Sequence, residues 1–386
     1  MKRLLTSTTA LVGLGMTAGQ AAAAEPIKLM VGGFFREAYM VNFDDDGEGE
    51  LGNERNTDGL FNDAEIHFMG MTTLDNGLSV GARVELEGED NAGDQIDEAW
   101  IHFSGGFGEV RIGSNDEALV GACILPPGGT DNFSAFSPNQ WAANVSPFAP
   151  GFPALTSNAV CIGVDDREDA QKIVYMTPVF AGFQLRVSYT PNGGDERHGD
   201  GVGPHVGMPT NSDGESRHNV SVYGTYELTR DTWSLTAGLG ASFEGHVEQQ
   251  PGDDQREQTF YQGGLNLTFG AFSIGGVFEY YDNLLSFKGG DDADAWVVGG
   301  GVAYEFEDFV LGAQYSHQDT EVDRAGGGND DFTMDRALVT AIYPLGPGID
   351  LDAEIAYTWI DTDPESADGV DDYQSLEIGL GTAITF

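Results

Sequence analysis

The chain has 386 residues, of which 17 are Lys or Arg and 63 are Asp or Glu, so its formal net charge is −46. A charge of this sign argues against nucleic acid or polyphosphate as a partner and favours cations or uncharged solutes. Glycine supplies 55 residues, roughly twice its ordinary share. This glycine content suits strands and tight turns better than helices.

The first 24 residues differ from the rest of the chain. Lys2 and Arg3 precede an apolar run that extends to about residue 18, and Ala22, Ala23 and Ala24 stand directly before Glu25. This layout is typical of a cleaved signal peptide, whereas an amphipathic core helix would not be apolar on all sides. No later stretch reaches the ~18 apolar residues that a membrane helix needs. No Pro-rich or Ser-rich linker follows, so we expect residues 25–386 to form one domain.

Alternation of apolar with polar residues is the main signal in the rest of the chain. It is clear over 78–86, 183–189 and 349–359, and apolar residues of one parity recur from Leu376 to Phe386. Such segments predict strands with one apolar face and one polar or charged face.

Short and long connections alternate between these segments. The seven short ones fall at 74–78, 105–109, 177–182, 228–232, 270–271, 305–308 and 344–348. The eight long ones cover 44–57, 88–95, 115–169, 191–216, 244–258, 282–293, 318–331 and 361–374. Fifteen connections join sixteen strands, and this anatomy is expected of an outer-membrane barrel. A soluble sandwich also alternates, but its turns follow no such rule.

A membrane environment requires the predicted sheet to close into a barrel. A sheet can cross hydrocarbon only if it has no open edge, and sixteen strands closed at ordinary tilt leave an aqueous lumen. Aromatic residues near predicted strand ends, such as Phe43, Tyr189 and Trp359, fit the two interfacial girdles of such a barrel.

Several segments resemble Gram-negative general porins of the alphaproteobacterial type. They are the turn at 74–78 with the following Arg83-Val84-Glu85, the run at 97–101 leading to 107–113, and the run at 173–178 followed by Gly182-Phe183. The C-terminal Phe386 is similar to the aromatic residue that such barrels present to the barrel-assembly machinery. The resemblance implies an all-β, 16-stranded antiparallel transmembrane β-barrel with a long third loop folded into the lumen. It also implies a homotrimer in the lipid and lipopolysaccharide of the cell outer membrane, where it passes small hydrophilic solutes.

The third long segment, 115–169, is singled out by its length, because long connections without secondary structure are usually functional or disordered. It is rich in aromatic residues and proline and contains both cysteines of the chain, Cys123 and Cys161. In an exported protein these two cysteines are expected to form a disulfide within the loop. Two buried free thiols are the alternative.

Strand parity aims five basic or titratable side chains into the lumen from the first five strands: Arg36, Arg83, Arg111, His67 and His102. The loop offers carboxylates to face them: Asp116, Glu117, Asp131, Asp165 and Asp166. In the porin family such an arrangement sets up a transverse field at the constriction. The alternative is that the arginines pair with inward Glu65, Glu85 and Glu98 as ordinary salt bridges.

The acidic excess lies mainly in the long connections. Residues 44–58 hold seven acids against Arg55 alone, and 361–372 hold six acids and no base. A rim this acidic should concentrate cations, so we expect cation preference. Calcium binding by Asp44, Asp46 and Glu48 is one hypothesis, but the run lacks the spacing of the twelve-residue calcium loop, and solvated charge is the alternative. No cofactor is required.

Enzyme motifs occur without their structural context. Ser79 in the G-x-S-x-G match at 77–81 lies in a predicted strand, whereas that motif needs a strand-to-helix turn. Glutamates in the G-x-G-x-x-G match at 47–52 would repel a pyrophosphate. We therefore expect no enzymatic activity. Two alternatives to a general porin are a sugar-selective porin, with loop aromatics stacking on sugars, and a secreted acidic calcium-binding adhesin.

Overall fold

The computed structural model describes residues 26–44, 56–88, 96–136, 160–161, 170–193, 216–247, 257–284, 292–324, 326–362 and 373–386. The predicted signal peptide, 1–24, lies outside these residues.

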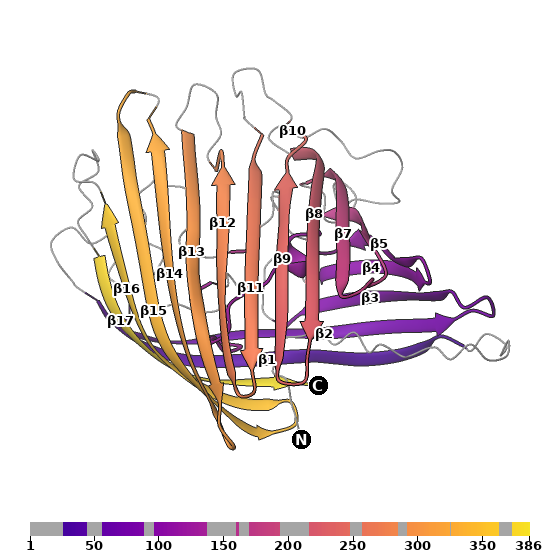
Figure 1. The fold of residues 1–386 in the computed structure, drawn as a ribbon, viewed down its shortest axis with the longest axis horizontal. Coiled ribbons are helices and arrows are strands. Elements are labelled where there is room, and N and C mark those ends of the chain that lie inside the picture. The colour runs from indigo at the N-terminus through magenta and orange to yellow at the C-terminus, as the bar shows by residue number, and fades with distance from the viewer. Residues whose placement is uncertain are drawn as a thin grey trace.

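One antiparallel sheet contains all the described strands (Figure 1). Its strands are β1 (Lys28–Asp44), β2 (Asp58–Thr73), β3 (Ser79–Glu87), β4 (Ile96–Gly105), β5 (Gly108–Ser114), β6 (Gln171–Met176), β7 (Phe183–Asn192), β8 (Ser216–Thr229), β9 (Trp233–Phe243), β10 (His246–Val247), β11 (Thr259–Phe269), β12 (Phe272–Asp282), β13 (Asp292–Glu305), β14 (Val310–Asp323), β15 (Asn329–Gly346), β16 (Ile349–Thr362) and β17 (Tyr373–Thr385). The two-residue β10 only extends the pairing of β8. Sixteen strands therefore form the wall, as predicted.

The sheet closes on itself because β1 pairs with β17 as well as with β2. The closing register runs from Phe34 opposite Thr385 to Asp44 opposite Ser375. In Figure 1 the strands follow one another around a closed wall, with β17 beside β1. No edge is left with unpaired backbone groups, which is what hydrocarbon requires of a spanning sheet.

The two faces of the wall have opposite chemistry. On β16, Leu351 and Ile355 are exposed, whereas the alternate residues Asp352, Glu354 and Thr358 are buried. The same parity holds around the sheet, and the most exposed outward residue of β9, Leu239, is 73% exposed. The apolar face therefore points outward and the polar face inward, the reverse of a soluble protein and the arrangement of a transmembrane barrel.

All seven predicted short connections are confirmed by the strand bounds. At the first, Gly77 adopts a positive φ of 83°, its amide donates to the Leu74 carbonyl at 2.9 Å, and the Leu78 amide donates to Asn76 Oδ1 at 3.1 Å. Glycine suits this position because an L side chain is strained there.

One predicted long connection is wrong. The segment 318–331 was expected to be a loop, but β14 and β15 pair as far as Asp323 opposite Asn329 and leave only 324–328 between them. The misreading has a physical reason: Gln318 and Thr320 face inward and are buried, so the end of β14 is a strand with polar residues on both faces.

An apolar core lies inside the barrel, between the wall and the described part of the third long segment, which includes a short 3-10 helix at Val120–Ala122. Phe136 and Val160 of that segment cluster with Phe260, Val277 and Tyr281 of the wall. Among the described residues, no helix is long and apolar enough to cross a membrane.

A charge on the outward face should therefore destabilise the barrel. Leu239→Lys places an ammonium in hydrocarbon and should lower the free energy of unfolding by about 2–4 kcal/mol if Leu239 sits near the bilayer midplane. Thr236→Lys, on the opposite face of the same strand, should cost less than about 1 kcal/mol. Urea unfolding in lipid vesicles measures both, and equal losses would contradict the assignment of faces.

Candidate pore constriction

The inward faces of β1, β2 and β3 carry ion pairs. Arg36 Nη1 lies 3.2 Å from Asp63 Oδ2, and Arg83 forms an ion pair with Glu85. His67 joins the second pair: its Nε2 lies 2.7 Å from Glu65 Oε2 and 3.1 Å from Glu85 Oε2, and Arg83 Nη2 lies 3.0 Å from its Nδ1. The structure thus brings Arg83 and His67 together, and places Arg36 beside a separate carboxylate.

A second group continues the wall on β4 and β5. Arg111 Nε donates to Glu109 Oε1 at 2.8 Å, and its guanidinium lies 4.5 Å from the centre of the Trp100 ring. The indole of Trp100 donates to Glu98 Oε2 at 3.1 Å. The centre of the His102 ring lies 5.5 Å from the centre of the Trp100 ring. Such a cation over an aromatic face is attracted by the ring electrons, which helps to fix Arg111.

The pairing partners differ in part from those considered from sequence. Arg83 does pair with Glu85, but Arg36 pairs with Asp63, and Arg111 pairs with Glu109. Each pair spans neighbouring strands or two positions of one strand. The sequence predicts which face of the sheet each arginine lies on, but the reach of its side chain decides which carboxylate it pairs with.

The described carboxylates of the loop occupy two places. The amide of Asp116 donates to Glu98 Oε1 of β4 at 2.9 Å, and Glu117 is buried. Glu98 belongs to the group of strands, β1 to β5, that carries Arg36, Arg83 and Arg111, which we call the arginine wall. Asp131 lies near β16, two strands from β1, where its charge acts on Asp350 and Asp352. The remaining two predicted positions, Asp165 and Asp166, lie outside the described residues.

Two inward arginines were missed from sequence. Arg186 on β7 donates to the carbonyl of Gly121 in the loop. Arg336 on β15 is 2% exposed and pairs with Glu377 at 2.6 Å and with Glu354 at 3.3 Å. The parity rule applied to β7 and β15 would have found both, because each faces inward in an alternating strand.

The loop begins its path along the inner wall by hydrogen bonding to two serines. The amides of Ala118 and Leu119 donate to the hydroxyls of Ser188 on β7 at 3.0 Å and Ser221 on β8 at 2.9 Å. These serines satisfy backbone groups that would otherwise be buried without a partner.

The loop reaches β16 and β1 on the other side of the barrel. Thr130 Oγ1 donates to Asp352 Oδ2 at 2.5 Å, and Asn132 Nδ2 donates to Asp352 Oδ1 at 2.8 Å. The ring of Phe133 is fully buried and packs against Met40 of β1. The described part of the loop thus contacts the polar face of the sheet from β7 round to β1.

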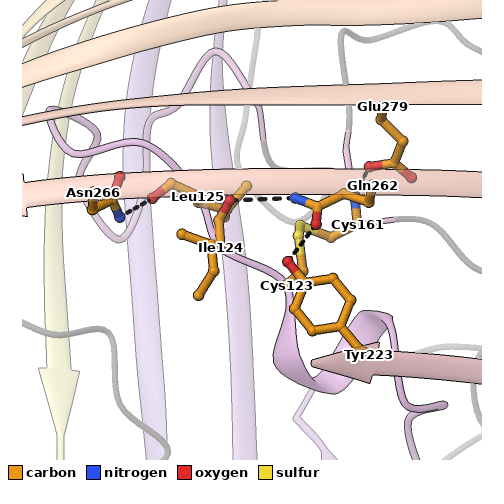
Figure 2. Close-up of a disulfide and its surroundings, with 8 residues drawn as sticks. All are labelled: Cys123, Ile124, Leu125, Cys161, Tyr223, Gln262, Asn266 and Glu279. Atoms are coloured by element: carbon orange, nitrogen blue, oxygen red, sulfur yellow. Dashed lines mark hydrogen bonds between the residues drawn. A yellow bond between two sulfur atoms is a disulfide. The ribbon is translucent and has the colours of Figure 1, made fainter. Parts of the chain in front are cut away.

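A disulfide joins the outgoing and returning parts of the loop (Figure 2). Cys123 and Cys161 are bonded, with a Cα–Cα distance of 5.7 Å, and the predicted disulfide is confirmed. Both sides are attached to the wall: the Cys161 amide donates to Glu279 Oε2 at 2.6 Å, and Gln262 Nε2 donates to the Ile124 carbonyl at 3.4 Å.

Replacement of both cysteines by serine should destabilise the folded protein. A cross-link across 38 residues restricts the unfolded chain and contributes about 3–4 kcal/mol in the chain-entropy model. We expect the double variant to unfold at a lower temperature by circular dichroism, and the wild type in reductant to match it. An unchanged midpoint in both would contradict this.

The structure leaves the calcium hypothesis open. Asp46 and Glu48 lie outside the described residues, and Asp44 is the last residue of β1. Elsewhere, Glu65 and His67 with Glu85 could hold a metal ion by their spacing, but Arg83 already neutralises Glu85 and contacts the imidazole.

Comparison with known proteins agrees with this geometry. The family described as Gram-negative porin matches residues 7–363, so the chain belongs to the Gram-negative porin family. The protein is therefore an outer-membrane channel, from a family of channels that are not enzymes. No curated protein matches it.

Solved structures share the fold at low sequence identity. The outer membrane channel DcaP of Acinetobacter baumannii is 14% identical with a TM-score of 0.59, over 95% of this chain and 99% of that one. An anion-selective porin from Comamonas acidovorans is 18% identical with a TM-score of 0.57, over 93% and 100%. The loop L8 deletion mutant of OmpT from Vibrio cholerae is 13% identical with a TM-score of 0.57, over 93% and 99%. The predicted barrel fold is thus confirmed.

Proposed function

We propose that this protein is a general diffusion porin of the alphaproteobacterial type that passes small hydrophilic solutes and prefers cations. One observation carries the proposal: a closed sheet is apolar outside and charged inside, and described residues of the third long segment hydrogen-bond to its inner face. The third loop narrows the lumen, and the arginine wall on β1 to β5 forms the other side of the constriction.

Charge on the wall supports cation preference. The three arginines of the predicted wall, Arg36, Arg83 and Arg111, are each paired with a carboxylate. Further inward carboxylates, Glu65 and Glu98, lie beside them. Acids therefore outnumber arginines there, and a lumen lined by one sign of charge raises the local concentration of the opposite ion.

The described aromatics of the loop favour a general porin over a sugar-selective one. Phe133 and Phe136 are 0% and 1% exposed, so neither ring presents a face on which a sugar could stack. The described aromatics of the loop thus hold it to the wall. An acidic secreted adhesin is not favoured, because the chain belongs to the porin family.

Assembly as a homotrimer in lipid and lipopolysaccharide belongs to the same proposal. A solved structure of in-vitro folded OmpT from Vibrio cholerae is described as a trimer form, and the fold is shared.

The C-terminal Phe386 pairs with Gly33 of β1 by two backbone hydrogen bonds of 3.1 Å, and its side chain is 63% exposed. An exposed terminal aromatic suits recognition by the assembly machinery. Export by the signal peptide at 1–24 and calcium at the acidic rim, which includes Asp44, complete the proposal.

Planar bilayer recordings of the purified protein test this function. We expect current steps in groups of three, a reversal potential of cation-preferring sign in a salt gradient, and no saturating block by any one sugar. Absence of channels would overturn the function, an anion-preferring potential would overturn the selectivity, and block by one sugar would favour the sugar-selective porin.

The arginine wall yields a more specific prediction. Arg83→Ala with Arg111→Ala removes two positive charges and two large side chains from the constriction. Single-channel conductance for potassium should rise, on the order of 1.5-fold, and cation preference should strengthen, because a more negative lumen attracts more cations. Arg230→Ala is the control, since Arg230 lies exposed in the short β8–β9 turn, where it donates to the Thr229 carbonyl. Equal conductance in all three proteins would contradict a role for the wall.

A further inference from the structure

Glycines occupy the inner wall where the loop crosses it. The inward positions in question are Gly264 on β11, Gly275 on β12, Gly301 on β13, Gly312 on β14, and Gly379 and Gly381 on β17. They face inward because their neighbours in sequence, such as Leu265, Ile274, Leu311 and Leu380, are exposed on the other face.

None of these glycines has room for a side chain, because loop atoms, and at Gly275, Gly312 and Gly381 also wall side chains, fill the space. A Cβ at Gly264 would overlap the carbonyl oxygen of Ile124 in the loop. In the same way, a Cβ at Gly301 would overlap that of Pro127, and a Cβ at Gly312 would overlap that of Gly128. At Gly275 it would overlap Asn266 Oδ1 of the wall and lie 2.8 Å from Pro127 Cδ of the loop. Real Cβ atoms do not approach other heavy atoms so closely, so only glycine permits this contact.

The strand register places four of the six glycines in two rows, and Gly264 and Gly381 lie two residues along the strand from Asn266 and Gly379 of those rows. Asn266 stands opposite Gly275, Gly275 opposite Gly301, and Gly301 opposite Gln314. One row thus crosses β11 to β14. A second row crosses β14 to β17, where Gly312 is opposite Thr340, Thr340 opposite Glu354, and Glu354 opposite Gly379.

Polar side chains in the same rows hold the loop that the glycines admit. Asn266 Nδ2 donates to the Leu125 carbonyl at 2.8 Å, and Gln314 Nε2 donates to the Pro126 carbonyl at 3.0 Å. Thr340 Oγ1 donates to the Gly128 carbonyl at 2.7 Å. Close approach and hydrogen bonding therefore act on the same stretch of loop, and the carbonyls from Ile124 to Gly128 accept hydrogen bonds from wall side chains.

We propose that these six glycines, the glycine seat, set the width of the constriction by letting the loop lie flat against the wall. Any side chain in the seat would push the loop backbone toward the arginine wall and narrow the pore. The proposal rests on the proposed function, because it names the residues that fix the pore size of that same channel.

Adjacent glycines on opposite faces provide matched tests. Gly264→Ala and Gly275→Ala place a methyl group in the seat. Gly263→Ala and Gly276→Ala place the same group on the outward face, where the nearest atoms are a Leu239 methyl at 3.4 Å and the Gly299 carbonyl oxygen at 3.3 Å. All four substitutions lie on the central parts of β11 and β12.

Single-channel conductance should fall by roughly a third in the two seat variants and stay at the wild-type value in the two outward variants, since a narrower constriction carries less current. Conductance that is unchanged or larger in the seat variants would overturn the proposal. If the wild type itself forms no channel, the proposed function fails instead, so the two failures are distinguishable.

A compensating pair keeps the test valid if a seat variant does not fold. A Cβ at Gly379 would lie 2.6 Å from the ring of Phe133, a side chain that can be shortened. Gly379→Ala should lower conductance in the wild type but have no effect in a Phe133→Ala background, where the methyl group has space. An equal change in both backgrounds would overturn the proposal, because the two effects would then be independent.

Discussion

The rest of this structure depends on one constraint: a sheet in hydrocarbon must satisfy all its backbone hydrogen bonds internally. Pairing of β1 with β17 meets it by removing both edges. Once the sheet is closed, alternation of side chains divides the wall into an outer apolar face and an inner polar face. Strand parity, not burial in a common core, therefore decides which residues meet lipid and which meet the channel.

Closure of sixteen strands leaves an interior wider than wall side chains can fill, and the described part of the third long segment contacts its inner face. The loop needs partners for its backbone groups there, and the wall supplies serines, Asn266, Gln314 and Thr340. It also needs close approach, which inward glycines allow. The disulfide then fixes the outgoing part of the loop to the returning part. The high glycine content of the chain is thus partly explained by loop packing as well as by turns.

The charged interior shows where prediction from sequence was strong and where it was weak. Parity predicts that Arg36, Arg83 and Arg111 share the inward face, because alternation is local and rigid. Their partners were only partly foreseen, since a long side chain can reach several carboxylates and the register decides which one is near. The β14–β15 connection was misjudged because inward residues of a barrel are polar, so a strand end and a loop have similar composition.

The sequence by itself determined the number of strands and the seven short turns, because these follow from a period of two and from turn residues. It predicted the disulfide with two free thiols as the alternative, because an exported chain with two cysteines allows one pairing. Only the tertiary structure decided the path of the third loop, the buried triad of Arg336 with Glu354 and Glu377, and the use of inward glycines as its seat. These features bring together residues more than a hundred positions apart or on several strands, and no local pattern encodes which strand a loop will lie against.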